Sequence, residues 1–417
     1  MKESLSKNMK RCSSDQDLLS RVSTPFFLFD TGKISEELEK LNKAKEDYWP
    51  NTITAYSVKT NNLPYLASFL SKAGVYAEVV SQDEYEMVSL CGYTDDMVVC
   101  NGPVKTDEFV CHLMDSCAII NLDSHRELTY AIRHAKDNPQ KQFAVGLRVN
   151  VDIEKYFPTE SKAGEQGSRF GFCMDNDELC KAILSIRECP NLKINGLHLH
   201  VSTSTRRVEV YSLLARLFCE ITSEYKLSDI QYFDIGGGFF GGISNKPQWA
   251  DYLSAVSEEL ISGGFSSGQL KLILEPGVSL LAGSFSYYTS VVDVKDTNRS
   301  RFVVTDGSRI HIDPFFHKTS YFYQHIKRQD CVSKKHPCQI VVGFTCLEYD
   351  NIMVMEDSEE IKVNDMFCFD KLGAYTLSLS PQFISFFPAV YAKTADGIVR
   401  CVREKWSAKD FLQESHL

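Results

Sequence analysis

Residues 53–80 read ITAYSVKTNNLPYLASFLSKAGVYAEVV, and this stretch decides the fold class. It opens with the apolar run of residues 53–58, whose length predicts a buried strand. A helix is expected over residues 64–72, because it begins with proline, a favoured residue of the first helical turn. The apolar run of residues 76–80 predicts the next strand. A strand, a helix and a second strand in that order indicate a parallel βαβ unit.

The same alternation of strand and helix continues along the chain. Further strands are expected at residues 97–100, 118–122, 143–149, 194–200, 230–235 and 270–274. Further helices are expected at residues 34–48, 83–90, 108–114, 126–135, 177–187, 208–225 and 249–261. Roughly eight such units within about 250 residues are what a TIM (β/α)8 barrel requires. In that fold the functional residues lie at the carboxyl ends of the strands.

The pattern changes after Gly277. Short β-rich runs with turn signals between them replace the alternation, and few helices are expected. These runs lie at residues 285–294, 301–304, 338–342, 366–369 and 397–403. The last part of the chain is therefore predicted to be a C-terminal all-β domain.

Composition excludes several classes of protein. Hydrophobic residues make up 43% of the 417 residues, an ordinary fraction for a globular protein, so general disorder is excluded. The formal charge of −10 argues against a surface for nucleic acid or for an anionic membrane. No apolar run reaches 18 residues, so no membrane-spanning helix is expected. Residues 1–21 lack the apolar core of a signal peptide, which predicts a cytoplasmic protein with a frayed N-terminus.

The 14 cysteines are scattered, and no Cys-x-x-Cys pair occurs among them. Disulfide scaffolds are usually short and far denser in cysteine. We therefore expect reduced cysteines that act as small buried apolar residues, with one chemical exception at most.

Lys59 is the first unusual residue at a predicted strand end. An isolated lysine in this position is usually a solvated side chain at the exit of a strand. A lysine in a partly desolvated barrel mouth can instead form a Schiff base with an aldehyde or ketone. The sequence around Lys59 leaves both interpretations open.

The run Gly196-Leu-His-Leu-His200 places His198 and His200 on one face of a strand. Three interpretations are open: packed core histidines, ligands of a zinc ion, or an aromatic platform for a planar ligand. No further His, Asp or Glu set with convincing ligand spacing accompanies them, and no metal site is predicted.

The run Asp234-Ile-Gly-Gly-Gly-Phe-Phe-Gly241 ends another predicted strand. Its glycines let backbone amides approach a phosphate group. The run also matches Gly-x-Gly-x-x-Gly, but a dinucleotide-binding fold would have this motif in its first unit. A phosphate site in a barrel is the better interpretation.

Glu275 follows the apolar run of residues 272–274. A buried carboxylate in this position must be paired, either in a structural ion pair or with a cationic ring nitrogen. A reactive lysine (Lys59), a ring-facing histidine (His200), a glycine-rich phosphate site and a buried acid are together what pyridoxal phosphate requires.

These residues carry a resemblance to a known family. The chain resembles the fold type III pyridoxal-phosphate-dependent decarboxylases, which include the diaminopimelate, ornithine and arginine decarboxylases. The resemblance extends from about Thr24 to Tyr391. Its markers are Tyr56-Ser-Val-Lys59-Thr-Asn, Gly196-Leu-His-Leu-His200, Asp234-Ile-Gly-Gly-Gly-Phe239, Glu275-Pro-Gly277, Cys346 with Asp350, and Gly373-Ala-Tyr375.

The resemblance implies an alanine-racemase-like TIM (β/α)8 barrel over residues 32–278 that binds pyridoxal 5'-phosphate. The β domain would combine residues 24–31 with residues 279–417, and residues 1–23 would be a disordered N-terminal segment. The active unit would be a homodimer with shared active sites. Its ligand would be a small amino-acid substrate, with neither nucleic acid nor membrane as a partner.

The resemblance also implies roles for individual residues. Lys59 would hold the cofactor, His200 would stack on its ring, and Glu275 would keep the ring nitrogen protonated. The phosphate group would be bound by Thr203, Gly238, Gly277 and Tyr375. Arg148 and Glu78 match positions near the cofactor.

Three residues of the β domain are implied near the substrate. Cys346 matches the family's proton donor and would reach across the dimer interface. Asp350 and Arg309 would contact the substrate. The resulting reaction would remove the α-carboxylate of an amino acid and release an amine and carbon dioxide.

Several residues depart from the family pattern. Val278 replaces an arginine that commonly touches phosphate, and either Arg206 or Arg207 could replace that contact. Leu347 replaces the acid that binds a distal amine of the substrate, and the neighbouring Glu348 would point elsewhere in an extended backbone. Ser202 replaces the glycine that usually follows the stacking histidine.

Residues 309–318 are basic, and the family holds substrate-binding groups near this segment. We therefore expect a substrate whose distal part is less cationic than that of ornithine. A diaminopimelate-like or a conjugated, carboxylate-bearing amino acid would fit, as in siderophore or other specialised biosynthesis.

Two alternatives to a decarboxylase remain open. The first is a catalytically inactive relative that binds a regulatory protein, as antizyme inhibitors do. Retention of Lys59, His200, Glu275, Cys346 and Asp350 argues against it. The second is an amino-acid racemase on the same barrel, which would need a second base on the opposite face of the substrate.

Overall fold

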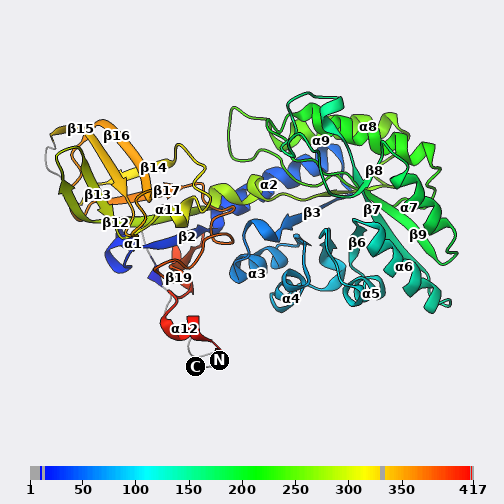
Figure 1. The fold of residues 1–417 in the computed structure, drawn as a ribbon, viewed down its shortest axis with the longest axis horizontal. Helices are drawn as coiled ribbons and strands as arrows, with labels where there is room; N and C mark the ends of the chain where they lie inside the picture. Colours follow the sequence, from blue (N-terminus) through cyan, green and yellow to red (C-terminus); the bar gives the residue numbers. More distant parts are fainter. Residues whose placement is uncertain (1–9, 12–14, 329–333, 414, 416–417) are drawn as a thin grey trace. The chain divides into compact units, whose positions relative to one another are not determined.

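The computed structural model describes residues 10–11, 15–328, 334–413 and 415. The chain forms two compact units (Figure 1), the first over residues 37–280. The second combines the described residues up to Glu36 with those from Leu281 onward. The sequence placed these divisions at residues 31/32 and 278/279, a few residues before each observed one.

The first unit is a closed barrel of eight parallel strands. Neighbours along the barrel follow the order β3, β4, β5, β6, β7, β9, β10 and β11, and β11 pairs with β3 to close it. The strands are β3 (Thr52–Ser57), β4 (Tyr76–Val79), β5 (Val98–Cys100), β6 (Ile119–Leu122), β7 (Phe143–Asn150), β9 (Leu192–His198), β10 (Tyr232–Asp234) and β11 (Lys271–Leu274). A two-residue strand, β8 (Phe172–Cys173), pairs with the end of β7. The predicted TIM barrel is confirmed.

A helix precedes the first strand of the barrel, and further helices connect successive strands. They are α2 (Thr31–Tyr48), α3 (Pro64–Lys72), α4 (Gln82–Leu90), α5 (Asp107–Asp115), α6 (His125–Asp137), α7 (Glu178–Arg187), α8 (Val208–Glu224) and α9 (Trp249–Ser262). Short 3-10 turns are η1 (Val58–Thr60), η2 (Asp95–Met97), η3 (Ile153–Lys155) and η4 (Ala282–Ser284).

Local chemistry explains where the helices after β4, β5 and β6 begin. The side-chain oxygens of Ser81, Thr106 and Ser124 each accept a hydrogen bond from a backbone amide in the following first turn. Such caps satisfy amides that have no partner within the helix. Each helix therefore starts a few residues beyond its strand, and the strand ends open onto short loops.

The second unit is built on one sheet of mixed direction. Its order is β1-β19-β18-β2-β12-β13-β15-β16, and β14 joins through β17 to β12. The strands are β1 (Lys10–Arg11), β2 (Phe26–Asp30), β12 (Phe285–Asp296), β13 (Arg301–Thr305), β14 (Phe322–Ile326), β15 (Lys335–Val342), β16 (Asn351–Glu359), β17 (Met366–Asp370), β18 (Ala389–Lys393) and β19 (Ile398–Arg403). Its helices are α1 (Asp15–Arg21), α11 (Arg309–Ile312) and α12 (Ala408–Leu412), and α10 (Val278–Leu281) lies at the division of the units.

Aromatic packing explains why the N-terminal strand β2 belongs to the second unit. The ring of Phe26 stacks on Tyr288 of β12 at 5.0 Å, and Phe29 stacks on Phe285 at 4.7 Å. All four rings are buried. Burying an aromatic side chain stabilises the fold by about 1.5–3 kcal/mol, so these contacts hold β2 between β12 and β18.

The prediction of disorder over residues 1–23 is wrong for part of that segment. Residues 15–21 form α1, and Leu18 is buried in a cluster with Phe26 and Leu28. An apolar anchor in a largely polar stretch holds this helix on the sheet. Residues 1–9 and 12–14 lie outside the described residues.

The cysteines are less buried than the sequence suggested. The twelve cysteines in the described part of the chain are free thiols. Cys100, Cys189 and Cys368 are buried, whereas Cys117, Cys338 and Cys346 are exposed. None of the helices in the described part of the chain is long and apolar enough to cross a membrane.

Candidate active site

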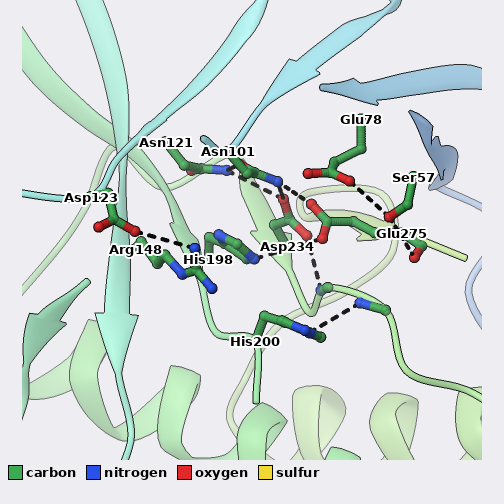
Figure 2. A network of polar contacts seen from close by, with 12 residues as sticks. Ser57, Glu78, Asn101, Asn121, Asp123, Arg148, His198, His200, Asp234 and Glu275 are labelled. Carbon is green, nitrogen blue, oxygen red and sulfur yellow. Dashed lines mark hydrogen bonds and ion pairs between the residues drawn. The ribbon is translucent and has the colours of Figure 1, made fainter. Parts of the chain in front are cut away.

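Each of the eight barrel strands brings a polar side chain to its carboxyl end, and Figure 2 shows how these side chains converge. They are Ser57 (β3), Glu78 (β4), Asn101 (after β5), Asn121 (β6), Arg148 (β7), His198 (β9), Asp234 (β10) and Glu275 (after β11). This is the end of a TIM barrel at which active sites are found. The barrel mouth is therefore the candidate active site.

Lys59 lies in the turn η1, directly after β3. Its Nζ contacts Oε2 of Glu78 at 2.5 Å and the Oγ of Ser57 at 3.4 Å. The Ser57 hydroxyl also donates to Oε2 of Glu78 at 2.7 Å. Glu78 is 1% exposed, but the Lys59 side chain is 39% exposed. One carboxylate thus anchors an amine that stays accessible from the barrel mouth.

Glu275 and Asp234 form a buried pair of carboxyl groups beside this lysine. Burial, the largest cause, raises the pKa of both groups, and the charges of Asp234 and Glu78 further raise the pKa of Glu275. The side-chain contact between the two acids adds to the rise in the pKa of Glu275 and opposes the rise in the pKa of Asp234. The pair therefore holds a proton near neutral pH, because two adjacent carboxylates cannot both ionise without strong repulsion.

Two asparagines orient the acid pair, and the sequence analysis missed both of them. The amide of Asn101 donates to Glu275 and, at 3.2 Å, to Oδ2 of Asp234. The amide of Asn121 donates to Oδ2 of Asp234 at 3.2 Å and to Oδ1 of Asn101 at 2.6 Å. Tyr232 completes the chain with a 2.8 Å bond to Asn121. The available signal was their position at the ends of two predicted strands.

His198 and His200 have nearly parallel rings whose centres lie 6.2 Å apart. Burial, followed by the charge of Arg148, lowers the pKa of His200 to about 3 and that of His198 well below its ordinary value. Nδ1 of His200 accepts a 3.2 Å hydrogen bond from the amide of Gly237, so Nε2 carries the hydrogen of the neutral ring. His200 therefore offers a neutral aromatic face.

His198, Asp234 and Glu275 place possible metal-ligating atoms within 4.8 Å of one another. Both ring nitrogens of His198 lack a hydrogen-bond partner within the described residues, and its Nε2 lies 3.8 Å from Oε2 of Glu275. The absence of a metal stays a prediction.

The glycine run forms a concave turn next to His200. Gly236 and Gly238 have positive φ values of 73° and 89°, which glycine adopts without strain. A Cβ on Gly236 would lie 2.3 Å from Nδ1 of His200, so only glycine lets the ring pack here. Within the described residues, the amide groups of Gly238 and Phe239 donate no hydrogen bond. Two free amides in a glycine turn are the donor set of an anion site.

The other predicted residues of the barrel lie around this pocket. Gly277 packs against Thr60, where a Cβ would lie 2.5 Å from the Thr60 methyl group. Thr203 is buried, and its hydroxyl accepts from the Arg206 amide at 3.2 Å. Arg148 pairs with Asp123 at 3.2 Å.

Four predicted site residues lie in the second unit. Cys346 is exposed on the loop between β15 and β16. Tyr375 is 41% exposed and has a positive φ of 57°. Asp350 is buried and accepts hydrogen bonds from the Ser308 hydroxyl, the Arg309 amide and the Thr345 hydroxyl.

Arg309 also has its hydrogen bonds occupied within the second unit. Its guanidinium pairs with Asp313 at 2.9 Å and donates to the carbonyl of Lys318 at 2.8 Å. Lys318 Nζ donates in turn to the carbonyl of Ile312 at 2.9 Å. The basic segment that the sequence suggested as a substrate contact thus binds largely to its own backbone and to Asp313.

Comparison with known proteins identifies the family. The family model described as "Pyridoxal-dependent decarboxylase, pyridoxal binding domain" matches residues 32–282. The chain belongs to the pyridoxal-dependent decarboxylases. The predicted family, the pyridoxal phosphate cofactor and the class of carboxy-lyase are confirmed at this level.

Named relatives of this decarboxylase cover almost the whole chain. Diaminopimelate decarboxylase of Aquifex aeolicus is 26% identical over 396 residues, which are 94% of this chain and 91% of that protein. The crystal structure of diaminopimelate decarboxylase from M. jannaschii with L-lysine has a TM-score of 0.83 at 20% identity, covering 99% and 98% of the two chains. The arginine decarboxylase of Paramecium bursaria Chlorella virus, bound to agmatine, has a TM-score of 0.74 at 18% identity, covering 91% and 98%. At these identities the structures show the fold.

Acid is expected to destabilise this decarboxylase through its buried histidines. The unfolded chain takes up histidine protons near pH 6.5, whereas the folded chain keeps His200 neutral down to about pH 3. Because the unfolded state then binds more protons, the free energy of unfolding should fall as the pH drops from about 6.5 towards 3. Urea unfolding at stepped pH measures this. In the variant His200→Phe the free energy of unfolding should fall less steeply as the pH drops. An unchanged slope would contradict the conclusion that His200 stays neutral in the folded chain.

Proposed function

We propose that this decarboxylase removes the α-carboxylate of an amino acid that carries a second carboxylate at its distal end, with diaminopimelate as the reference substrate. The observation that carries the reaction is Lys59, an accessible amine beside a buried pair of acids in the barrel mouth. The substrate class is supported by relatives named diaminopimelate decarboxylase, which match 94% of this chain.

The barrel mouth fits pyridoxal phosphate on its own geometry. The free amides of Gly238 and Phe239 suit a phosphate group, and the neutral ring of His200 suits the face of a pyridine. The protonated Glu275 suits a ring nitrogen, to which it can give its proton. Lys59 would hold the aldehyde through Nζ. When bound, the cofactor supplies a cationic conjugated ring that accepts the electron pair left at the α-carbon.

The protein's own groups then control protons around the α-carbon. Glu78 orients the Nζ of Lys59, and Ser57 fixes that carboxylate from the other side. The Asn101 amide donates to both Asp234 and Glu275 and so holds the two carboxyl groups together. These contacts fix Lys59 and Glu275 in position before the substrate binds. Preorganised groups of this kind are a main source of the stabilisation that enzymes give to charge in the transition state.

We assign Cys346 as the proton donor, contributed by the second subunit of a homodimer. Its loop is a compact turn: the Asp350 amide donates to the Leu347 carbonyl at 2.9 Å, and the Asp350 carboxylate accepts from the Thr345 hydroxyl at 2.6 Å. Asp350 is therefore assigned to positioning this loop, in place of the direct substrate contact that the sequence suggested.

The same turn carries the residues that would determine which charge the distal end of the substrate meets. In an extended backbone Glu348 would point away from the site, but residues 344–346 form a bend, residues 348–349 form a turn, and Glu348 is exposed. Leu347 occupies the expected place of an acid and offers no charge to a distal ammonium group. This supports a substrate whose distal charge is balanced by a carboxylate.

A substrate panel tests the proposal. Diaminopimelate, L-lysine, L-ornithine, L-arginine and carboxylated conjugates of lysine and ornithine are scored by carbon dioxide release, with Lys59→Ala as the blank. We expect carboxylate-bearing substrates to exceed ornithine and lysine by at least about 10-fold in kcat/KM. Faster turnover of free ornithine or lysine contradicts the substrate class. Loss of stereochemistry in recovered substrate without carbon dioxide release would identify a racemase.

Mixing two inactive variants tests the shared active site. Random pairing of Lys59→Ala and Cys346→Ala subunits makes about half of all dimers hybrid, and each hybrid has one intact site out of two. About one quarter of the wild-type activity should therefore return after subunit exchange. A mixture of Lys59→Ala with Glu275→Gln is the control, since both changes lie in the barrel and no intact site can form. No recovery in the first mixture would place Cys346 and Lys59 of one site in the same chain.

A further inference from the structure

The glycine turn that would receive the cofactor phosphate has free amide donors but no charge of its own. A phosphate carries close to two negative charges near neutral pH, and charge-assisted contacts are about twice as strong as neutral ones. Three cations lie nearby in sequence or space and could provide the charge: Arg206, Arg207 and Lys246.

Arg206 is the cation that the structure places against the glycine turn. Its Nη1 donates to the carbonyl of Phe239 at 3.3 Å, one residue after Gly238. Its guanidinium carbon lies 5.3 Å from the centre of the Phe240 ring. Arg206 therefore contacts Phe239, one of the two residues with a free amide, and Phe240, the residue after it.

The backbone of Arg206 is held in place on both sides. Its amide donates to Thr203, and its carbonyl accepts a 2.7 Å bond from the Tyr252 hydroxyl. The same hydroxyl accepts from the Phe240 amide at 3.3 Å, so Tyr252 joins Arg206 to the end of the glycine turn. Arg206 has a positive φ of 53°, and such a conformation persists only when its surroundings impose it.

A buried acid fixes the rest of this loop. Glu160, 4% exposed, accepts from the Thr205 amide and hydroxyl through one carboxylate oxygen, both at 2.8 Å. Its carbonyl accepts from the Ser204 amide at 2.8 Å. The guanidinium is thus carried by a preorganised loop, which lowers the entropy lost when it binds an anion.

The other two cations differ from Arg206 in their contacts. Arg207 pairs with Glu209 at 3.2 Å, lies over the ring of Phe157 and has a 44% exposed side chain. Lys246 is exposed, and its Nζ lies 5.3 Å from the centre of the Phe240 ring. Both serve as matched controls, since each carries the same charge within a few residues of the same loop or ring.

We infer that Arg206 is the cationic residue that binds the cofactor phosphate in this decarboxylase, together with the amides of Gly238 and Phe239. The inference rests on the proposed function of the barrel mouth as the cofactor site. It assigns to a loop residue after β9 the positive charge that Val278 does not supply.

Equilibrium dialysis of the full-length protein against pyridoxal phosphate and against pyridoxal, which lacks the phosphate, tests this assignment. Arg206→Gln retains a side-chain donor for the Phe239 carbonyl but removes the charge. It should weaken pyridoxal phosphate binding by about 10- to 100-fold and change pyridoxal binding by less than about 3-fold. Arg206→Lys should recover part of the loss, and Arg207→Gln and Lys246→Gln should leave both affinities unchanged.

Other outcomes would overturn the assignment in distinct ways. An Arg206→Gln protein that binds pyridoxal phosphate like the wild type shows that Arg206 is not the phosphate cation. Equal losses for both ligands assign Arg206 to the structure of the loop, and circular dichroism checks the folding of each variant. A wild-type protein that binds neither ligand would contradict the proposed function itself.

Discussion

Replacing Lys59 with alanine is expected to lower decarboxylation by roughly 10^4-fold or more, the scale of losing a residue that forms a covalent bond during catalysis. Lys59 is the amine that Glu78 and Ser57 hold at the barrel mouth. Borohydride reduction of the wild-type protein followed by peptide mass analysis should find the cofactor attached at Lys59. The variant should yield no such peptide.

The same substitution has a structural consequence that can be measured separately. Removing Lys59 leaves the buried Glu78 carboxylate with Ser57 as its remaining donor among the contacts at the barrel mouth. Since the lysine is partly exposed, we expect a loss of about 1–3 kcal/mol in the free energy of unfolding. The double variant Lys59→Ala with Glu78→Gln should regain most of that stability without activity. Lys193→Ala, which breaks an exposed pair with Asp229, should alter neither quantity.

Glu275→Gln is expected to lower activity by about 10^2- to 10^3-fold while stabilising the cofactor-free protein. Glutamine keeps the hydrogen bonds to Asp234 and Asn101 but carries no proton that a ring nitrogen could take. Burial raises the pKa of the Glu275 carboxyl. Above its ordinary value of about 4.5 the unfolded carboxyl ionises while the folded one stays protonated, so this group destabilises the wild type increasingly as the pH rises.

Thermal unfolding of the variant and the wild type between pH 5 and pH 9 measures this effect. The stability difference in favour of Glu275→Gln should grow with pH. Glu127→Gln is the matched control, because Glu127 is equally buried but forms an ion pair with Lys105 at 2.8 Å. Breaking that pair should destabilise the protein by about 3–5 kcal/mol. A Glu275→Gln variant that loses stability to the same extent would show that Glu275 is ionised in the folded state.

Much of the barrel could be predicted from the spacing of apolar residues, because the signals that begin and end each helix or strand lie within that element. The helix predicted over residues 64–72 has the observed bounds of α3, because a first-turn proline and a C-terminal Gly74 with positive φ mark both ends. The positions of Lys59, His200 and Glu275 at strand ends also followed, since all parallel strands of a barrel end at one mouth.

The N-terminal segment shows where local reasoning failed. Residues 15–21 are mostly polar, and nothing in their own composition predicts a stable helix. Leu18 finds its apolar partners in Phe26 and Leu28, and also in Tyr288 and Val399, more than 200 residues away. Such a contact exists only once the sheet has formed.

The sequence by itself determined the barrel, the second β-rich unit and the family, and it predicted the residues at strand ends that would hold pyridoxal phosphate. Tertiary structure alone decided which side chains touch. Barrel closure brings Asn101 and Asn121 into contact with Asp234, more than 100 residues away. The Asp350 carboxylate, predicted to contact the substrate, accepts a hydrogen bond from the Arg309 amide. The fold likewise brings Arg206 to the Phe239 carbonyl, whereas its neighbour Arg207 pairs with Glu209. Spacing along the chain gives direction within one element, whereas hydrogen-bond partners depend on register between elements distant in sequence.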